Sequence, residues 1–152
     1  MPVDAEREIT VTCGATEAAA AVFLALFNPG DEVLIFEPFY ENYGPDAILC
    51  GATPVFVPLT PPDWQFDAAA LEGAITPRSK ALVLNSPHNP TGHVFSRAEL
   101  EAIARICIAH DLLVITDDPY DYIVFQGEHI PMATLPGMRD RTVAIATLSE
   151  PF

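Results

Sequence analysis

The sequence predicts an α/β fold of three layers, α/β/α, in which helices cover both faces of a mostly parallel sheet. Short apolar or β-branched runs alternate with longer stretches of helical pattern, and this alternation is typical of successive βαβ units. The chain has 152 residues, half of them hydrophobic, so it is the size of one domain and can bury a substantial core. No internal repeat is visible, and the proline-rich stretch Pro58–Pro62 is interpreted as a surface loop.

The strands are predicted from apolar and β-branched runs bounded by glycine, proline or polar residues. In chain order these runs are Ile9–Thr12, Val33–Phe36, Pro54–Val57, Ala81–Asn85, Leu112–Thr116 and Thr142–Ala146. In an open parallel sheet, ligands bind outside the carboxyl ends of the strands. The residues that follow each run are therefore the ones to inspect for function.

The helices are predicted from their periodicity and from the signals at their ends. Ser96 is a typical N-cap, and Glu99 three residues later completes a capping box. Gly30 and Gly51 follow the ends of two other helical stretches, as C-terminal glycines do. The predicted helices are Thr16–Phe27, Tyr40–Cys50, Asp67–Ile75 and Ser96–His110.

Charge and cysteine content exclude several classes of function. Seven Lys and Arg against twenty-one Asp and Glu give a net charge of −14, which repels nucleic acid and anionic membrane surfaces. The three cysteines are widely spaced and form no cluster with histidine, so neither a disulfide framework nor a metal site is indicated. The longest apolar run, Ala18–Phe27, is about half the length of a membrane span. With no signal peptide visible, we expect a cytoplasmic protein without a membrane segment.

Two of the predicted strands are followed by residues suited to holding a flat anionic ligand. After the first, Gly14, Ala15 and Thr16 form a glycine turn that opens a helix, and a helix N-terminus is a natural phosphate site. An ordinary turn with Thr16 as N-cap is the alternative. After the second strand, Tyr40 could place an aromatic face against a ring-shaped ligand, although such aromatics also commonly belong to a core.

Two further strands end in polar side chains. The run NSPHNPTG, residues 85–92, places prolines around Asn89, whose amide can donate a hydrogen bond, although a plain Asn-Pro-Thr-Gly turn is an equal alternative. The strand Leu112–Thr116 leads into Asp117, with Tyr120 three positions later. A carboxylate at this position can pair with a cationic ring nitrogen, but it can also cap the next element.

In their order and spacing, these groups resemble the large domain of the fold type I pyridoxal-phosphate enzymes, specifically the class I and II aminotransferases. The resemblance extends over almost the whole chain, from ITVTCGATEAAAAVFLALFNPGDEVLIFEPFYENY to AHDLLVITDDPYDYIVFQGE. Its most specific part is the NPTG motif at 89–92 followed by Asp117 and Tyr120 at the end of the next long strand. The resemblance implies amino group transfer between an amino acid and a 2-oxo acid, with pyridoxal 5'-phosphate as cofactor, in a homodimer.

The resemblance also implies roles for individual residues. The backbone amides of Gly14, Ala15 and Thr16 would bind the cofactor phosphate, and the Tyr40 ring would stack on the pyridine. Asn89, with Tyr120, would bond the phenolic oxygen of the ring. Asp117 would pair with the pyridinium nitrogen, and alternation along a strand directs the neighbouring Asp118 to the other face.

The sequence departs from the family pattern where the Schiff-base lysine is expected. Glu150 stands at that position, and the only lysine of the chain is Lys80, before the strand Ala81–Asn85. We expect residues 1–152 to be a partial cofactor-binding large domain, without the family's N-terminal segment and C-terminal small domain, and without turnover.

Three alternatives remain at this point. The fold could serve a non-catalytic protein that binds pyridoxal phosphate or another phosphate-bearing ligand, or that pairs with a full-length homologue. A related lyase or synthase that uses the same cofactor shares much of the motif set. A nucleotide-binding oxidoreductase is supported only by the first strand, glycine and helix, and the chain has no Gly-x-Gly-x-x-Gly motif there.

Overall fold

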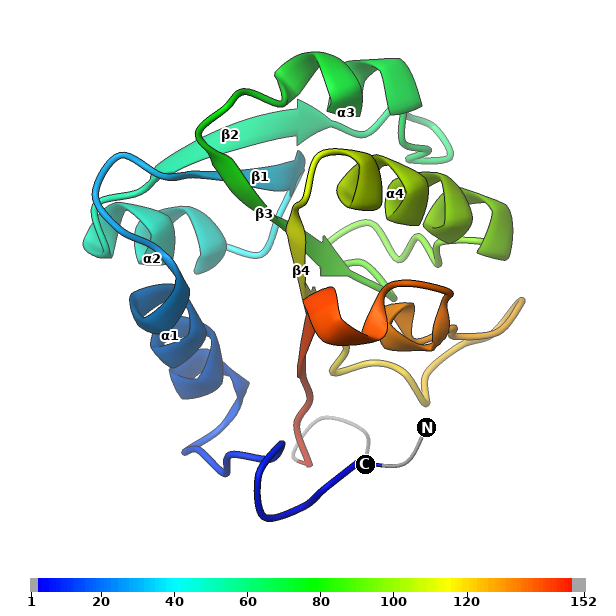
Figure 1. Ribbon diagram of the computed structural model, residues 1–152. Coiled ribbons are helices and arrows are strands. Elements are labelled where there is room, and N and C mark those ends of the chain that lie inside the picture. The colour runs from blue at the N-terminus through cyan, green and yellow to red at the C-terminus, as the bar shows by residue number, and fades with distance from the viewer. Residues whose placement is uncertain (1–2, 149–152) are drawn as a thin grey trace.

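The fold is a single parallel sheet with helices on both faces, as the computed structural model, which describes residues 3–148, shows (Figure 1). Within that range the sheet has five strands in the order β2-β1-β3-β4-β5, and every neighbouring pair is parallel. The predicted three-layer α/β/α architecture is confirmed. The strands are β1 Glu32–Glu37, β2 Thr53–Pro58, β3 Ser79–Asn85, β4 Leu113–Asp117 and β5 Thr142–Ile145.

The helices begin and end within three residues of the predicted bounds. In the same described range the α-helices are α1 Ala15–Leu26, α2 Tyr43–Leu49, α3 Ala68–Ala74 and α4 Arg97–Ala109. The capping box predicted at Ser96 and Glu99 is present at the start of α4, and Asp67 caps α3 by accepting the Ala69 N–H at 2.8 Å. Two short 3-10 helices that the sequence did not predict, Met132–Thr134 and Arg139–Arg141, precede β5.

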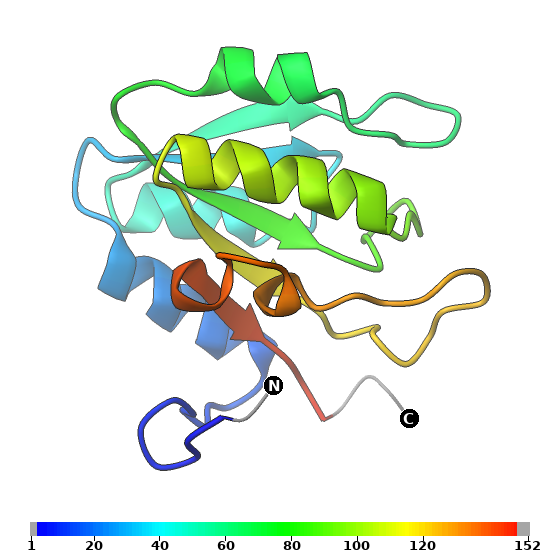
Figure 2. The ribbon, with the colours of Figure 1, turned by 45° about the vertical axis from the view of Figure 1, so that its right-hand side comes forward.

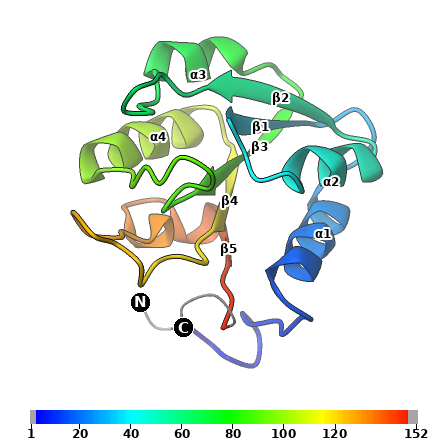
Figure 3. The ribbon, with the colours of Figure 1, turned by 180° about the vertical axis from the view of Figure 1, so that it is seen from behind.

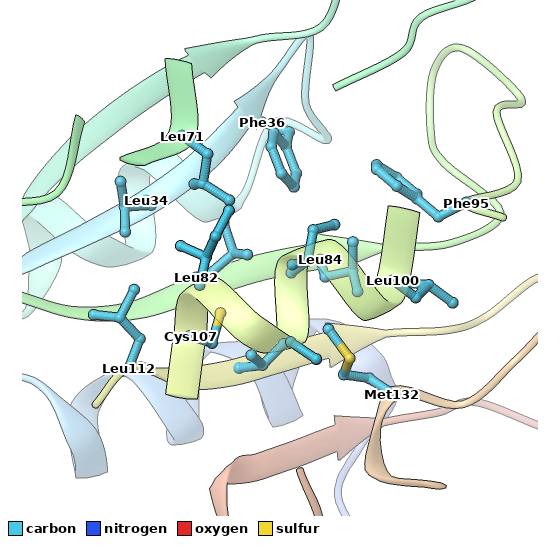
Figure 4. Packing of buried hydrophobic residues seen from close by; sticks show 14 of the residues in the cluster. Leu34, Phe36, Leu71, Leu82, Leu84, Phe95, Leu100, Cys107, Leu112 and Met132 are labelled. Carbon is cyan, nitrogen blue, oxygen red and sulfur yellow. The ribbon is translucent and has the colours of Figure 1, made fainter. Parts of the chain in front are cut away.

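Alternating side chains of the sheet supply two separate cores. One core joins Leu34, Leu82 and their neighbours to α3 and α4, with Met132 at its edge (Figure 4). The other joins Val33, Val83 and their neighbours to α1 and α2. In Figure 2, α4 therefore lies in front of the sheet with α2 behind it, and Figure 3 shows α1 and α2 together on the second face. Strands buried on both faces account for the continuous apolar runs in the sequence.

The predicted first strand, Ile9–Thr12, is wrong, because this segment pairs with no strand in residues 3–148. A cleft of about 450 Å³ separates it from the β5 side of the sheet, and Val11 is 92% exposed. A strand exists only where a neighbouring backbone lies about 4.8 Å away to complete the hydrogen-bond ladder. The β-branched pattern of the segment is therefore not sufficient.

None of the helices within residues 3–148 has both the length and the apolar composition that crossing a membrane requires.

Candidate functional site

A pocket lies outside the carboxyl ends of β1, β3 and β4. The chain passes from β1 to β2 on one side, then crosses back to place β3 on the other side of β1, so the loops after β1 and β3 leave in opposite directions. Ligands of open α/β sheets bind at this kind of switch point. The lining residues are Ala15, Thr16, Ala19, Tyr40, Asn42, Tyr43, Asn85, Asn89, Asp117, Pro119 and Tyr120.

The pocket brings together residues that are more than 100 positions apart in the sequence. All but one of the seven residues predicted to bind the cofactor line it: Ala15, Thr16, Tyr40, Asn89, Asp117 and Tyr120. The exception is Gly14, which is the N-cap of α1 and lines the neighbouring cleft beside β5. Glu150, at the expected lysine position, lies outside the described residues.

The N-terminus of α1 opens on this pocket. Gly14 has a φ of +86°, a conformation that favours glycine, and no side chain within residues 3–148 caps the helix there. Glu17 instead accepts a hydrogen bond from the Cys13 N–H, just outside the helix. Ala15 and Thr16, the first residues of a 12-residue helix, thus present backbone amides and the positive end of the helix dipole to the pocket. Thr16 is not the N-cap, which sets aside the ordinary-turn interpretation of that residue.

Asp117 is a buried carboxylate at the end of β4, 8% exposed. The Tyr43 hydroxyl donates a hydrogen bond to its Oδ2 at 2.5 Å, and the Asn85 amide donates to its backbone oxygen at 2.6 Å. Burial, and next the negative charge of Asp117, raise the pKa of Tyr43, so the phenol stays protonated and acts as the donor. A carboxylate held in this way can accept a hydrogen bond from a cationic ligand group.

Asn89 is held in the pocket by its own backbone. Its N–H donates to Asn85 Oδ1 at 2.6 Å, so the two asparagines of the NSPHNPTG run are bonded to each other. The Tyr40 ring meets the Tyr43 ring edge-on, with centroids 5.9 Å apart and an interplanar angle of 70°. The Asn89 amide and the Tyr40 ring therefore lie on separate loops that line the same pocket.

Asp118 occupies the opposite side of the chain from Asp117, as strand alternation predicts. Its Oδ2 lies 3.9 Å from His129 Nε2, and both side chains are largely buried. Burial is the main cause that raises the pKa of Asp118 to about 7, and the charges of Asp117 and Asp121 raise it further. Of the two neighbouring carboxyl groups, Asp117 alone lines the pocket.

Sequence reasoning missed Tyr43 and Asn85. The sequence patterns assign no binding role to Tyr43, which lies inside the predicted helix Tyr40–Cys50, or to Asn85, which ends the predicted strand Ala81–Asn85. A polar residue ending a fully apolar strand was the available signal for Asn85. For Tyr43 the signal was its position three residues after Tyr40, because residues three apart lie on the same side of the predicted helix Tyr40–Cys50.

Comparison with known proteins identifies the family. The model of the family described as aminotransferase class I and II matches residues 1–150. The chain belongs to this family. Class I and II aminotransferases depend on pyridoxal phosphate. The oxidoreductase alternative is left without support.

Individual aminotransferases are similar over nearly all of the chain. The chain is 51% identical to the "Probable N-succinyldiaminopimelate aminotransferase DapC" of Mycobacterium tuberculosis, over 98% of this chain and 38% of the relative. It is 44% identical to human kynurenine–oxoglutarate transaminase 1, over 99% of this chain and 38% of that protein. The chain therefore spans less than half the length of these relatives.

Solved structures of aminotransferases share the fold. The structure of N-succinyldiaminopimelate aminotransferase from Mycobacterium tuberculosis matches with a TM-score of 0.97 and 49% identity, over 99% of this chain and 40% of that one. A mutant aspartate aminotransferase of Thermus thermophilus matches with a TM-score of 0.89 and 35% identity, over 95% of this chain and 39% of that one.

Proposed function

We propose that residues 1–152 form the cofactor-binding part of an aminotransferase large domain, which holds pyridoxal 5'-phosphate for amino group transfer between an amino acid and a 2-oxo acid. One observation carries the proposal. A helix N-terminus, an aromatic ring, a side-chain amide and a buried carboxylate line one pocket at the switch point of the sheet.

This set of groups fits the chemistry of the cofactor. Pyridoxal phosphate carries a phosphate anion, a flat ring with a nitrogen that can be protonated, and a phenolic oxygen. The first-turn amides at Ala15 and Thr16 suit the anion, and Tyr40 offers a ring face. Asn89 and Tyr120 can bond the phenolic oxygen, and Asp117 can accept the ring N–H.

Each of these residues would have a defined task. When bound, the cofactor accepts the electron pair released as a bond at an amino acid α-carbon breaks. Asp117 would hold the proton at the ring nitrogen, because a carboxylate stabilises the protonated form. The Tyr43 hydroxyl fixes the direction of that carboxylate, and the Asn85 amide fixes its backbone. Asn89 would hold the ring by a hydrogen bond to its phenolic oxygen.

A titration of the chain with pyridoxal phosphate tests the proposal, with absorbance and equilibrium dialysis as readouts. Asp117→Asn should change the absorption of the bound cofactor and weaken binding about 10- to 100-fold, because a hydrogen bond to a charged group contributes about 1.5–3 kcal/mol. Asp140→Asn, which removes an exposed carboxylate, is the matched control and should leave both unchanged. A chain that does not bind pyridoxal phosphate, but is stabilised by a nicotinamide dinucleotide, would refute the proposal.

The lysine pattern supports binding without covalent attachment and without turnover. Lys80 lies at the amino end of β3, where its Nζ is 3.3 Å from Asp31 Oδ2. Asn85, at the carboxyl end, is five residues further along the strand, and at about 3.3 Å for each residue the two are about 16 Å apart. Lys80 is therefore at the wrong end of the sheet. A Glu150 carboxylate cannot replace a primary amine in bonding to an aldehyde.

The variant Glu150→Lys tests this part of the proposal. Borohydride treatment followed by peptide mass spectrometry should find a pyridoxyl group at position 150 of the variant and none on the original chain. A pyridoxyl group on Lys80 of the original chain, together with measurable turnover, would contradict the argument.

The proposal also covers assembly, location in the cell and substrate. We propose a cytoplasmic homodimer, which is supported by free, widely spaced cysteines and by exposed apolar side chains on α1 and α2, namely Leu24, Ile48 and Leu49. Relatives of 51% and 44% identity are named for different amino acids, N-succinyldiaminopimelate and kynurenine, so no single substrate is favoured.

A further inference from the structure

We propose that Asn85 is a positioning residue of the candidate site, which fixes the Asn89 loop and the Asp117 carboxylate relative to each other. The consequence for a ligand rests on the proposed function, whereas the hydrogen bonds belong to the chain alone. Asn85 is the last residue of β3, is 4% exposed and lines the pocket. It pairs in register with Asp117, the last residue of β4.

The two ends of the Asn85 side-chain amide bond to two different elements. Its Nδ2 donates to the Asp117 backbone oxygen at 2.6 Å, across to β4. Its Oδ1 accepts the Asn89 backbone N–H at 2.6 Å, from the loop that follows β3. Asn85 therefore joins the residue proposed to hold the ring nitrogen of the cofactor to the residue proposed to hold its phenolic oxygen.

The partners of Asn85 also determine which way its amide faces. The Asp117 backbone oxygen can only accept a hydrogen bond, and the Asn89 N–H can only donate one. The amide nitrogen therefore faces β4 and the amide oxygen faces the loop. An aspartate of the same size keeps an acceptor for the loop but loses the amide nitrogen that faces β4, and a leucine has neither group. The two bonds together thus require an amide at this position.

Each partner of this amide is fixed by a further contact of its own. The Tyr43 hydroxyl donates to Asp117 Oδ2 at 2.5 Å, so the carboxylate is also held from α2. The turn that contains Asn89 is closed by the Gly92 N–H, which donates to the His88 carbonyl at 2.7 Å. The amide between these two units therefore governs how the loop lies relative to the carboxylate. A ring bound by both groups depends on that placement, because displacement of either group weakens its contacts.

Hydrogen exchange and NMR of the ligand-free chain test the two bonds directly. The Asn89 N–H should exchange slowly in the original chain and in Asn85→Asp, and about tenfold faster in Asn85→Leu, which removes its acceptor. The backbone signals of Asp117 should shift in both variants, because both replace the amide nitrogen that faces β4. Asn28→Leu, at an exposed asparagine after α1, is the matched control and should leave the exchange and the signals as in the original chain.

Pyridoxal phosphate binding tests the consequence. Asn85→Leu should weaken binding about tenfold and shift the absorption of the bound cofactor, because Asn89 and Asp117 both lose their placement. The loss of affinity should be smaller in the background of Asn89→Ala, since Asn85 acts partly through that residue. A residue with a structural role alone would lower Tm without altering the absorption of the bound cofactor.

The outcomes separate this inference from the proposed function. If the original chain does not bind pyridoxal phosphate, the proposed function fails, and the exchange of the Asn89 N–H still decides the role of Asn85. Fast exchange of that N–H in the original chain would overturn the inference, and so would an Asn85→Leu variant that keeps the slow exchange, the affinity and the absorption. If Asn85→Leu does not fold, Asn85→Asp decides, and unchanged Asp117 signals in that variant would overturn the inference.

Discussion

Replacing Tyr43 with phenylalanine removes one hydroxyl group from the buried bond to Asp117. Tyr43 is 3% exposed and Asp117 8%, and water therefore has little access to replace the lost donor. A hydrogen bond to a charged group contributes about 1.5–3 kcal/mol, and a buried carboxylate that loses its donor costs a similar amount. We expect Tyr43→Phe to lower the free energy of unfolding by about 1.5–3 kcal/mol. In a domain of this size, each kcal/mol of lost stability lowers Tm by about 3 °C, so we expect Tm to fall by about 5–9 °C.

Urea unfolding followed by circular dichroism measures the loss, with Tyr122→Phe as the matched control. Tyr122 is 82% exposed, and the control should stay within about 0.5 kcal/mol of the original chain. The double variant Tyr43→Phe with Asp117→Asn completes a thermodynamic cycle. Tyr43→Phe should lower the free energy of unfolding by less in the Asp117→Asn background than in the original chain, because the carboxylate is already gone. If Tyr43→Phe unfolds at the same urea concentration as Tyr122→Phe, the hydroxyl does not hold Asp117 and the reasoning is refuted.

Two further predictions concern a neighbouring carboxyl group and the helix N-terminus. The Asp118 carboxyl group has a pKa near 7, against 3.8 ordinarily, so the folded chain holds the carboxyl proton more tightly than the unfolded chain does. The folded chain therefore loses stability as the pH rises from about 4 to 7. Asp118→Asn removes this titration, so relative to the original chain it should gain stability across this interval, by up to roughly 4 kcal/mol above pH 7. If the difference in the free energy of unfolding between Asp118→Asn and the original chain is the same at pH 4.5 and at pH 8, the prediction is contradicted. Thr16→Glu places a negative charge at the start of α1 and should weaken pyridoxal phosphate binding without loss of helical circular dichroism, while unchanged affinity by equilibrium dialysis would remove this turn from the site.

The order of strands and helices was determined by the sequence, because local physics decides it. Buried parallel strands require apolar runs, and the capping box at Ser96 and Glu99 marks the start of α4 without any distant contact. The candidate residues Tyr40, Asn89 and Asp117 could be selected in the same way, since each stands at or after the end of an apolar run that forms a strand of the sheet.

Tertiary structure decided which of these features have partners. Ile9–Thr12 has the pattern of a strand, yet no backbone in the described residues completes its ladder. The bond between Tyr43 and Asp117 spans 74 positions, and no local pattern reports it. Propensity and periodicity act over a few residues, whereas a site forms where the sheet brings the ends of distant strands together, and only the folded chain determines those distances.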